Sequence, residues 1–158
     1  MNRICKRIFA LIIVLTVFLS FHMTAFAAES NTDVMNREML LKINDLRAEY
    51  NLSALTEDPE LSTYAQIRAE EITTNFSHTR PDGTQGYDII PLTRSYAGEN
   101  LSYFSMEDGV ETAAEQTFAA LVNSPTHLEN MVASEYTKIG IASVEANGRM
   151  YVAYLFSN

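Results

Sequence analysis

Apolar residues recur every three or four positions along three stretches of the chain, which is the spacing of one buried face of an α-helix. The first stretch begins at Arg37, and its apolar positions are Met39, Ile43, Leu46 and Tyr50. The second follows Asp58-Pro59, and its apolar positions are Leu61, Ala65, Ala69, Ile72 and Phe76. The third follows Ser105, and its apolar face contains Val110, Ala114, Thr117 and Leu121. The pattern predicts three amphipathic helices.

Capping residues set the predicted helix boundaries. Asp58 is a good N-cap, and Pro59 suits the first helical position because proline lacks the N–H that the first turn leaves unpaired. Ser124 and Pro125 repeat this arrangement, which predicts a fourth, short helix with the Ser124 side chain as its cap. Ser105 is predicted to cap the third helix.

Two stretches near the C-terminus, Lys138–Glu145 and Met150–Ser157, are rich in Ile, Val, Tyr and Phe and are predicted as β-strands. Asn147-Gly148 between them is the strongest short hairpin signal, because both residues tolerate positive φ. Tyr96–Phe104 is predicted as a further short strand. Helices precede the paired strands, so the predicted class is α+β, with an antiparallel sheet whose apolar face lies under the helices.

Residues 1–27 have the three parts of a secretory signal peptide. A basic segment precedes an apolar run from Ile8 to Phe21, and Ala25-Phe26-Ala27 supplies the small-x-small cleavage pattern. The alternative is an uncleaved membrane anchor, since the apolar run approaches the length of a bilayer span. The cleavage pattern favours removal, and a secreted, extracytoplasmic protein is therefore predicted.

Removal of residues 1–27 leaves 131 residues, the size of one domain. Residues 28–36 are polar and are predicted as a flexible leader, and residues 37–158 as the folded domain. Its 20 acidic residues outnumber 8 basic ones, so the mature net charge is −12. This charge repels phosphate backbones and argues against nucleic-acid binding. No transmembrane segment is predicted after the signal peptide, and the domain is expected to be a monomer.

Three residues are candidates for chemistry: His78 before a proline-glycine turn, Glu99 after a glycine, and His127 at the start of the short helix. Two histidines and a carboxylate are a recurrent ligand set for zinc, with a fourth position left for water or substrate. The positive end of a helix opposes protonation, so His127 is expected to stay neutral. Spacing alone does not show that the three residues meet. The adjacent carboxylates Glu70-Glu71 are interpreted as part of a solvated helix face.

Four blocks of the sequence occur in the order seen in domains of the CAP superfamily, which comprises cysteine-rich secretory proteins, antigen 5 and pathogenesis-related proteins. The chain resembles the bacterial secreted, SCP-like branch of that superfamily. The blocks are Phe76-Ser77-His78-Thr79-Arg80-Pro81-Asp82-Gly83, Gly98-Glu99-Asn100-Leu101, Asn123-Ser124-Pro125-Thr126-His127 and Thr137-Lys138-Ile139-Gly140-Ile141. The resemblance implies a three-layer α-β-α sandwich with a central antiparallel sheet and a large cleft.

In members of that superfamily the cleft holds two histidines and two acidic residues. The resemblance assigns His78 and Glu99 as the first histidine and first acid, and His127 as the second histidine. Ser124 stands where the second acid is expected, so that acid is missing. Within this assignment His78 and His127 are the expected metal ligands, with Glu99 as an additional candidate, and zinc or another divalent cation is the expected ion.

The resemblance favours a secreted protein that binds a ligand in a His/Glu-lined cleft, without a conventional catalytic activity. The ligand classes considered are a divalent metal, a lipid and a cell-envelope component. One alternative is a metal-assisted hydrolase, in which His78 and His127 hold the ion and Glu99 serves as ligand or general base. Another is a structural protein of the envelope or spore surface.

Overall fold

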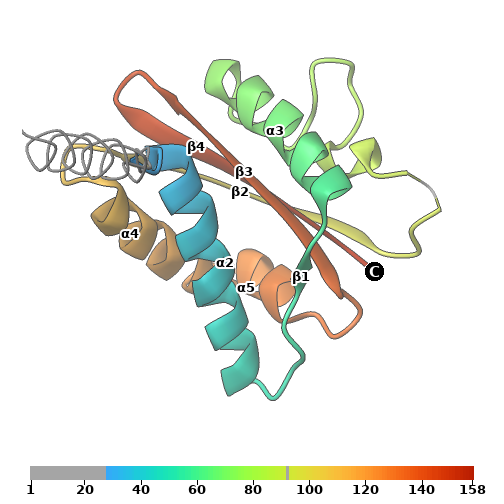
Figure 1. Cartoon of the computed structure of the whole chain (residues 1–158). Helices are drawn as coiled ribbons and strands as arrows, with labels where there is room; N and C mark the ends of the chain where they lie inside the picture. The colour runs from blue at the N-terminus through green and yellow to red at the C-terminus, as the bar shows by residue number, and fades with distance from the viewer. Residues whose placement is uncertain (1–27, 92) are drawn as a thin grey trace, which may run out of the picture.

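The computed structural model describes residues 28–91 and 93–158, so the predicted signal peptide at residues 1–27 lies outside the described residues. Helices precede and alternate with the strands of one sheet (Figure 1). The helices are α2 (Asn31–Glu49), α3 (Pro59–Thr74), α4 (Val110–Val122), α5 (Pro125–Val132) and the 3-10 helix η1 (Gly86–Ile89). The strands are β1 (Thr56–Glu57), β2 (Ala97–Ser105), β3 (Lys138–Ala146) and β4 (Arg149–Ser157).

The sheet has the strand order β1-β3-β4-β2. Strand β4 pairs antiparallel with β3, as predicted, and also pairs antiparallel with β2 on its other side. The hairpin between β3 and β4 turns at Asn147 and Gly148, whose φ angles of 53° and 70° are the left-handed values that a two-residue hairpin needs. The two-residue strand β1 pairs parallel with β3, so the sheet is mixed rather than wholly antiparallel.

Helices cover both faces of the sheet, which gives three layers (Figure 1). Alternate residues of β4 divide between the two cores, because successive side chains of a strand point to opposite faces. Met150, Val152, Tyr154 and Phe156 pack in the core under α2, α4 and α5. Tyr151, Ala153 and Leu155 pack in the core under α3. The predicted α+β class and three-layer α-β-α sandwich are confirmed.

Helix α3 lies directly on the backbone of β3. A Cβ atom on Gly140 of β3 would overlap the backbone of Leu61 and Ser62 in the first turns of α3. Asp58 caps this helix as predicted, since its Oδ1 accepts hydrogen bonds from the Glu60 and Leu61 N–H groups at 3.0 and 3.2 Å. The position of α3 against the sheet is therefore set at its N-terminal end.

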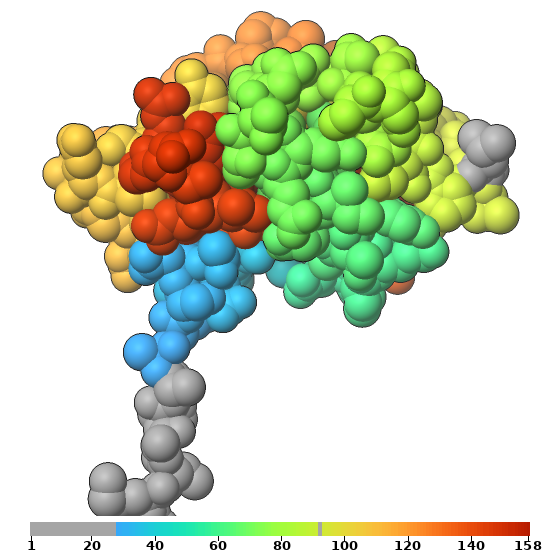
Figure 2. All heavy atoms as spheres, turned by 90° about the horizontal axis from the view of Figure 1, so that it is seen from above, coloured from blue at the N-terminus to red at the C-terminus, as the bar shows by residue number. Residues whose placement is uncertain are grey.

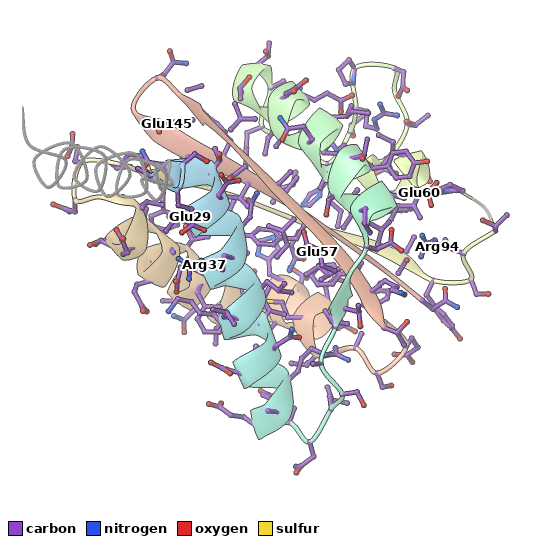
Figure 3. The ribbon with its side chains drawn as sticks, in the orientation of Figure 1. Glu29, Arg37, Glu57, Glu60, Arg94 and Glu145 are labelled. Atoms are coloured by element: carbon purple, nitrogen blue, oxygen red, sulfur yellow. The ribbon has the colours of Figure 1, made fainter. Side chains whose placement is uncertain are left out.

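Arg94 joins the start of α3 to the end of β4 (Figure 3). Its Nη2 donates to Asp58 Oδ2 at 3.0 Å and to Glu60 Oε2 at 3.2 Å, while its Nη1 donates to Ser157 Oγ at 3.1 Å. Burial alone would raise the pKa of Asp58. The hydrogen bonds from the Leu61 N–H and from Arg94 outweigh burial and lower that pKa.

The first helix begins earlier than predicted. Ser30 is its N-cap and accepts a hydrogen bond from the Asp33 N–H at 3.1 Å, and Met35 is fully buried. Residues 31–36 are therefore helical, and the prediction of a flexible leader over them is wrong. Their polar side chains lie mainly on the exposed side of an ordered helix. Tyr50 at the other end is half-exposed and is not part of the buried stripe.

The third helix begins later than predicted. Ser105 is the last residue of β2, and its Oγ accepts from the Glu107 N–H at 3.3 Å in the turn that follows. Gly109, with a φ of 86°, stands at the N-cap position of α4 instead. Phe76 of the second predicted stripe lies beyond the end of α3 and is exposed. Within the described residues, no helix is both long enough and apolar enough to cross a membrane.

Candidate functional site

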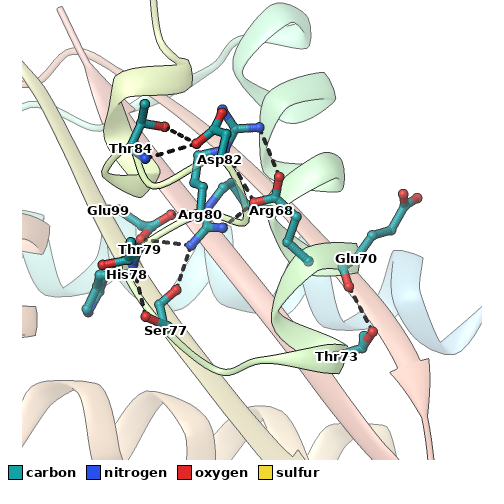
Figure 4. Close-up of polar contacts among 11 residues, drawn as sticks. Arg68, Glu70, Thr73, Ser77, His78, Thr79, Arg80, Asp82, Thr84 and Glu99 are labelled. Carbon is teal, nitrogen blue, oxygen red and sulfur yellow. Dashed lines mark hydrogen bonds and ion pairs between the residues drawn. The ribbon is translucent and has the colours of Figure 1, made fainter.

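His78 and Glu99 are in direct contact (Figure 4). His78 follows α3 in a loop, Glu99 is the third residue of β2, and His78 Nδ1 lies 2.8 Å from Glu99 Oε1. An ionised carboxylate can only accept hydrogen bonds, so Nδ1 carries the proton. The His78 side chain is 55% exposed whereas that of Glu99 is 1% exposed. Within the described residues, Nε2 of this half-exposed imidazole has no hydrogen-bond partner.

Arg68, on the buried side of α3, is a member of the site that the sequence analysis did not identify. Its side chain is 1% exposed, and its Nε donates to Glu99 Oε2 at 2.7 Å. Its Nη2 lies 3.4 Å from Glu99 Oε1. Both carboxylate oxygens of Glu99 are therefore occupied by protein donors.

The same guanidinium reaches two further groups. Arg68 Nη1 forms a short ion pair with Glu71, and Nη2 donates to the backbone carbonyl of Ser77 at 2.8 Å. Burial opposes the charge of Arg68, but the hydrogen bonds that Arg68 donates to Glu99 and Glu71 outweigh burial and raise the pKa of Arg68. The Arg68 side chain is thus held as a cation at the centre of the site.

Glu71 connects this cation to the loop that carries His78. Arg80 Nη2 donates to Glu71 Oε1 at 2.9 Å, and Arg80 Nη1 donates to Asp82 Oδ2 at 3.2 Å (Figure 4). Burial would raise the pKa of Glu71, but its bonds to Arg80 and Arg68 lower it. Only Glu70 fits the interpretation of Glu70-Glu71 as a solvated face, because Glu71 is largely buried between two arginines.

A cavity of about 220 Å³ borders these ion pairs. It is lined by Arg68, Glu71, Thr74, Asn75, Thr79 and Pro81. The His78 side chain is exposed to solvent. The site is therefore a surface position beside a small cavity and not a deep enclosed pocket.

Gly86 allows the Glu99 carboxylate to lie where it does. A Cβ atom at this position would overlap the Glu99 carboxylate group. The Gly86 N–H also donates to the carbonyl of His78 at 2.7 Å. One glycine therefore makes room for the carboxylate and fixes the backbone of the histidine that binds it.

His127 approaches the same part of β2 from the other layer. Asn100 Nδ2 donates to the His127 carbonyl at 2.9 Å, and Asn130 Nδ2 donates to the Glu99 carbonyl at 3.1 Å. In the space-filling view α5 (orange) and the segment after α3 (light green) adjoin along one edge of the surface (Figure 2). The two histidine-bearing segments are thus brought to neighbouring residues of one strand.

The pKa of His127 is lowered, chiefly by burial and to a smaller extent by the charge of His78. The prediction that His127 stays neutral is confirmed in direction, although burial rather than the helix terminus is the main cause. Pro125 is the first residue of α5, as predicted. Ser124 occupies the N-cap position, but its side chain makes no capping hydrogen bond. The prediction that this side chain caps the helix is wrong.

A model of the cysteine-rich secretory protein family, CAP, matches residues 40–157. The matched segment is more than half of the chain. The chain belongs to the CAP family. A search of curated proteins finds no match.

Solved structures share the CAP fold at low sequence identity. An outer surface protein from Borrelia burgdorferi is 22% identical with a TM-score of 0.67, over 78% of this chain and 92% of that protein. An extracellular SCP-domain protein from Bacillus anthracis is 21% identical with a TM-score of 0.63, over 80% of this chain but only 41% of that protein. The structure of NaASP2 with Zn²⁺ is 17% identical with a TM-score of 0.60, over 82% of this chain and 83% of that protein.

The CAP site of this chain differs from the expected set of two histidines and two acids. Among residues 28–91 and 93–158, no group of three or more His, Cys, Asp or Glu side chains is arranged to hold a metal ion. The Glu99 carboxylate faces Arg68 and His78. The imidazoles of His78 and His127 stay candidate donors for a ligand.

The sequence pattern alone does not identify two members of this site, Arg68 and Asn130. Arg68 lies one position before Ala69 and three after Ala65, on the stripe that predicts the buried face of α3. A charged residue on such a stripe is a signal for a buried ion pair, because an unpaired buried charge is very costly. Asn130 carries no comparable signal, since its contacts with β2 depend on tertiary structure alone.

Proposed function

We propose that this CAP-domain protein is exported and binds a divalent metal ion of the zinc class through His78 and His127, without catalytic turnover. The observation that carries the proposal is the bond from His78 Nδ1 to Glu99 Oε1 at 2.8 Å. Histidines that bind metals usually donate their other ring N–H to a carboxylate or carbonyl, which fixes the tautomer and aims the free nitrogen. His78 has this arrangement.

In this proposal Glu99 orients His78 and is not itself a metal ligand. Arg68 neutralises the carboxylate and occupies the oxygen that His78 leaves free. Neutral imidazoles suit Zn²⁺, Cu²⁺ and Ni²⁺, whereas Ca²⁺ and Mg²⁺ require several oxygen ligands. A site with two protein donors, completed by water, exchanges its ion readily. The relative NaASP2, solved with Zn²⁺, makes zinc the first ion to test.

The contacts of Glu99 argue against the alternative of a hydrolase. A general base needs a lone pair within hydrogen-bonding reach of the water that it activates. Both oxygens of Glu99 already accept hydrogen bonds from Arg68 and His78, and the side chain is only 1% exposed, so the carboxylate has little access to water. Ser124 cannot replace the missing second acid as a base, so binding is favoured over turnover.

Two of the three ligand classes fit the site less well. The His78 side chain is 55% exposed in a polar setting, whereas a lipid chain requires an apolar enclosure. A cell-envelope component remains as an indirect partner that a bound ion would bridge. Export is supported by the signal-peptide pattern of residues 1–27 and by relatives described as an outer surface protein and an extracellular protein.

Isothermal titration of the purified protein with Zn²⁺, Ca²⁺ and Mg²⁺ tests the proposal. We expect one Zn²⁺ per chain, no saturable binding of Ca²⁺ or Mg²⁺, and loss of Zn²⁺ binding in His78→Gln and His127→Gln. Glu70→Gln is the matched control, because Glu70 is an exposed carboxylate on α3 whose side chain accepts from Gln66. Zinc binding that survives in both histidine variants would contradict the proposal.

A further inference from the structure

One buried guanidinium holds both partners of the contact between His78 and Glu99. Arg68 Nε donates to the Glu99 carboxylate at 2.7 Å, and Arg68 Nη2 donates to the carbonyl of Ser77, the residue before His78, at 2.8 Å. The side chain of Arg68 is 1% exposed and is among the largest fully buried side chains described. Its contacts therefore fix the carboxylate and the backbone of the imidazole relative to each other.

We infer that Arg68 is the positioning residue of His78, and that it keeps the proton on Nδ1 and the lone pair of Nε2 directed outward. The donors of a guanidinium lie in one plane at fixed angles, so an arginine can hold two acceptors in a defined relative geometry. A lysine at this position supplies a single ammonium group and cannot hold two acceptors in this planar geometry.

A purely stabilising role does not account for this arrangement. Burying an ion pair costs about as much desolvation free energy as the pairing returns, and apolar replacements of similar volume often stabilise a fold equally well. Arg68 lies beside Ala65, Ala69 and Ile72 on the buried face of α3, where an apolar residue would serve packing. The Arg68 guanidinium instead links Glu99 of β2 to the backbone of the loop at Ser77.

Arg68 belongs to a chain of four charged residues that runs from the loop to β2. Arg80 in the loop pairs with Glu71, Glu71 pairs with Arg68, and Arg68 pairs with Glu99 (Figure 4). Positive and negative groups alternate from the loop to β2. As a result, ion pairs connect both the loop after His78 and the Glu99 carboxylate to Arg68 of α3.

The chain offers a matched control in its second buried arginine. Arg47 of α2 is also almost fully buried, and it donates to the carbonyls of Ser53, Met131, Ala133 and Tyr136. Met131 and Tyr136 belong to the core under α2, α4 and α5, on the face of the sheet opposite α3. Arg47→Lys therefore reproduces the loss of a buried guanidinium without touching Glu99 or Ser77.

Nitrogen-15 NMR of the imidazoles at pH 8 tests the inference without any metal. We expect His78 of the wild-type protein to show the Nδ1–H tautomer, and Arg68→Lys to shift it toward a mixture of both tautomers. Arg47→Lys should leave the His78 signals unchanged. An unchanged His78 tautomer in folded Arg68→Lys, or an equal shift in Arg47→Lys, would overturn the inference.

Zinc titration of Arg68→Lys gives a second readout, which rests on the proposed function. Changes in residues that orient a metal ligand typically lower metal affinity by 10–100-fold. We therefore expect Arg68→Lys to lose about tenfold, whereas Glu70→Gln, at an exposed position of the same helix, should lose little. If the wild-type protein does not bind Zn²⁺, the proposed function fails while the tautomer result still decides the inference.

A third measurement covers the case in which Arg68→Lys does not fold. In the wild-type protein, the Arg68 Nε–H and the His78 Nδ1–H should both exchange slowly with solvent, because each donates to a buried carboxylate. Rapid exchange of the Arg68 Nε–H would contradict the inference. Slow exchange of both protons would support it.

Discussion

Asn100 Nδ2 donates a hydrogen bond to the backbone carbonyl of His127 at 2.9 Å, which ties α5 to the edge strand β2. Glu99 and Asn100 are neighbours on that strand, and successive side chains point to opposite faces of a sheet. Glu99 therefore meets Arg68 and His78 on the side of α3, while Asn100 meets α5 on the other side. Because β2 is an edge strand, segments from both layers can reach the same two residues.

Replacement of Asn100 by alanine should loosen α5. The change removes the donor to His127 and leaves Asn130 Nδ2 with only the Glu99 carbonyl. Loss of a buried hydrogen-bond partner costs about 1–3 kcal/mol, and we expect urea unfolding to show a decrease of this size. Asn123→Ala is the control, since Asn123 is exposed and bonds within its own helix turn, and it should change stability by less than about 0.5 kcal/mol. Equal effects of the two variants would contradict this account of Asn100.

Gly86→Ala should disturb the site and the fold together. The added methyl group would overlap the Glu99 carboxylate, and overpacking of a filled interior costs about 1–3 kcal/mol. We also expect a loss of zinc affinity, because Glu99 must move away from His78. Gly83→Ala separates the two effects. Gly83 has a φ of 88° with open space around it, so alanine there should strain the backbone without weakening zinc binding.

The two predicted helix caps should respond differently to alanine. Asp58 accepts two backbone hydrogen bonds and pairs with Arg94, so Asp58→Ala should lower the free energy of unfolding by about 1–2 kcal/mol. Ser124 makes no capping hydrogen bond, and Ser124→Ala should change it by less than about 0.5 kcal/mol. Urea unfolding of both variants checks this. A larger cost for Ser124→Ala would restore the cap that the sequence predicted.

These two caps show how far the sequence predicts the structure. Asp58-Pro59 and Ser124-Pro125 carry the same local signal, and both helices begin where that signal predicts. The N-cap preference identifies a backbone position, but a serine side chain makes the bond only if its rotamer and surroundings allow it. The hairpin at Asn147-Gly148 was predictable because it depends on two adjacent residues alone.

The candidate site was only partly predictable for the same reason. His78, Glu99 and His127 could be named from sequence blocks, and the approach of a histidine to Glu99 follows from the cost of an unpaired buried carboxylate. Arg68 supplies most of that pairing, and its partner is 31 residues away on another element. Helical periodicity shows which positions are buried, but it does not show which distant carboxylate a buried arginine meets.

Stability should fall as the pH drops below about 6.5, the ordinary pKa of histidine. The pKa of His127 is lowered in the folded state, so the unfolded chain takes up this proton first as the pH falls. The stabilising contribution of neutral His127 is therefore complete above the unfolded pKa and is lost as the pH falls through the folded pKa. Urea unfolding at pH 7.5, 6.5 and 5.5 should show this decrease, and His127→Gln should reduce it. A decrease that is the same in His127→Gln would assign it to other groups.

Arg47 is buried with backbone carbonyls as its partners. Its Nη1 donates to the carbonyls of Met131 and Ala133 at 3.0 and 2.9 Å, and its Nη2 donates to that of Tyr136 at 3.2 Å. The pKa of Arg47 is lowered by burial. The three acceptors lie at and just after the C-terminal end of α5, whose last carbonyls have no partner within the helix. Arg47 therefore caps the C-terminal end of α5, the helix that carries His127.

Arg47→Met should be among the most destabilising single changes in the domain. Methionine fills a comparable part of the volume, so the loss comes from carbonyls left without a donor, each costing about 1–3 kcal/mol when buried. Removal of the buried charge offsets part of this cost. We expect a net decrease of about 3 kcal/mol in urea unfolding, together with faster amide exchange in residues 125–132. A decrease below about 1 kcal/mol with unchanged exchange would show that α5 is held by its contacts with β2 and not by Arg47.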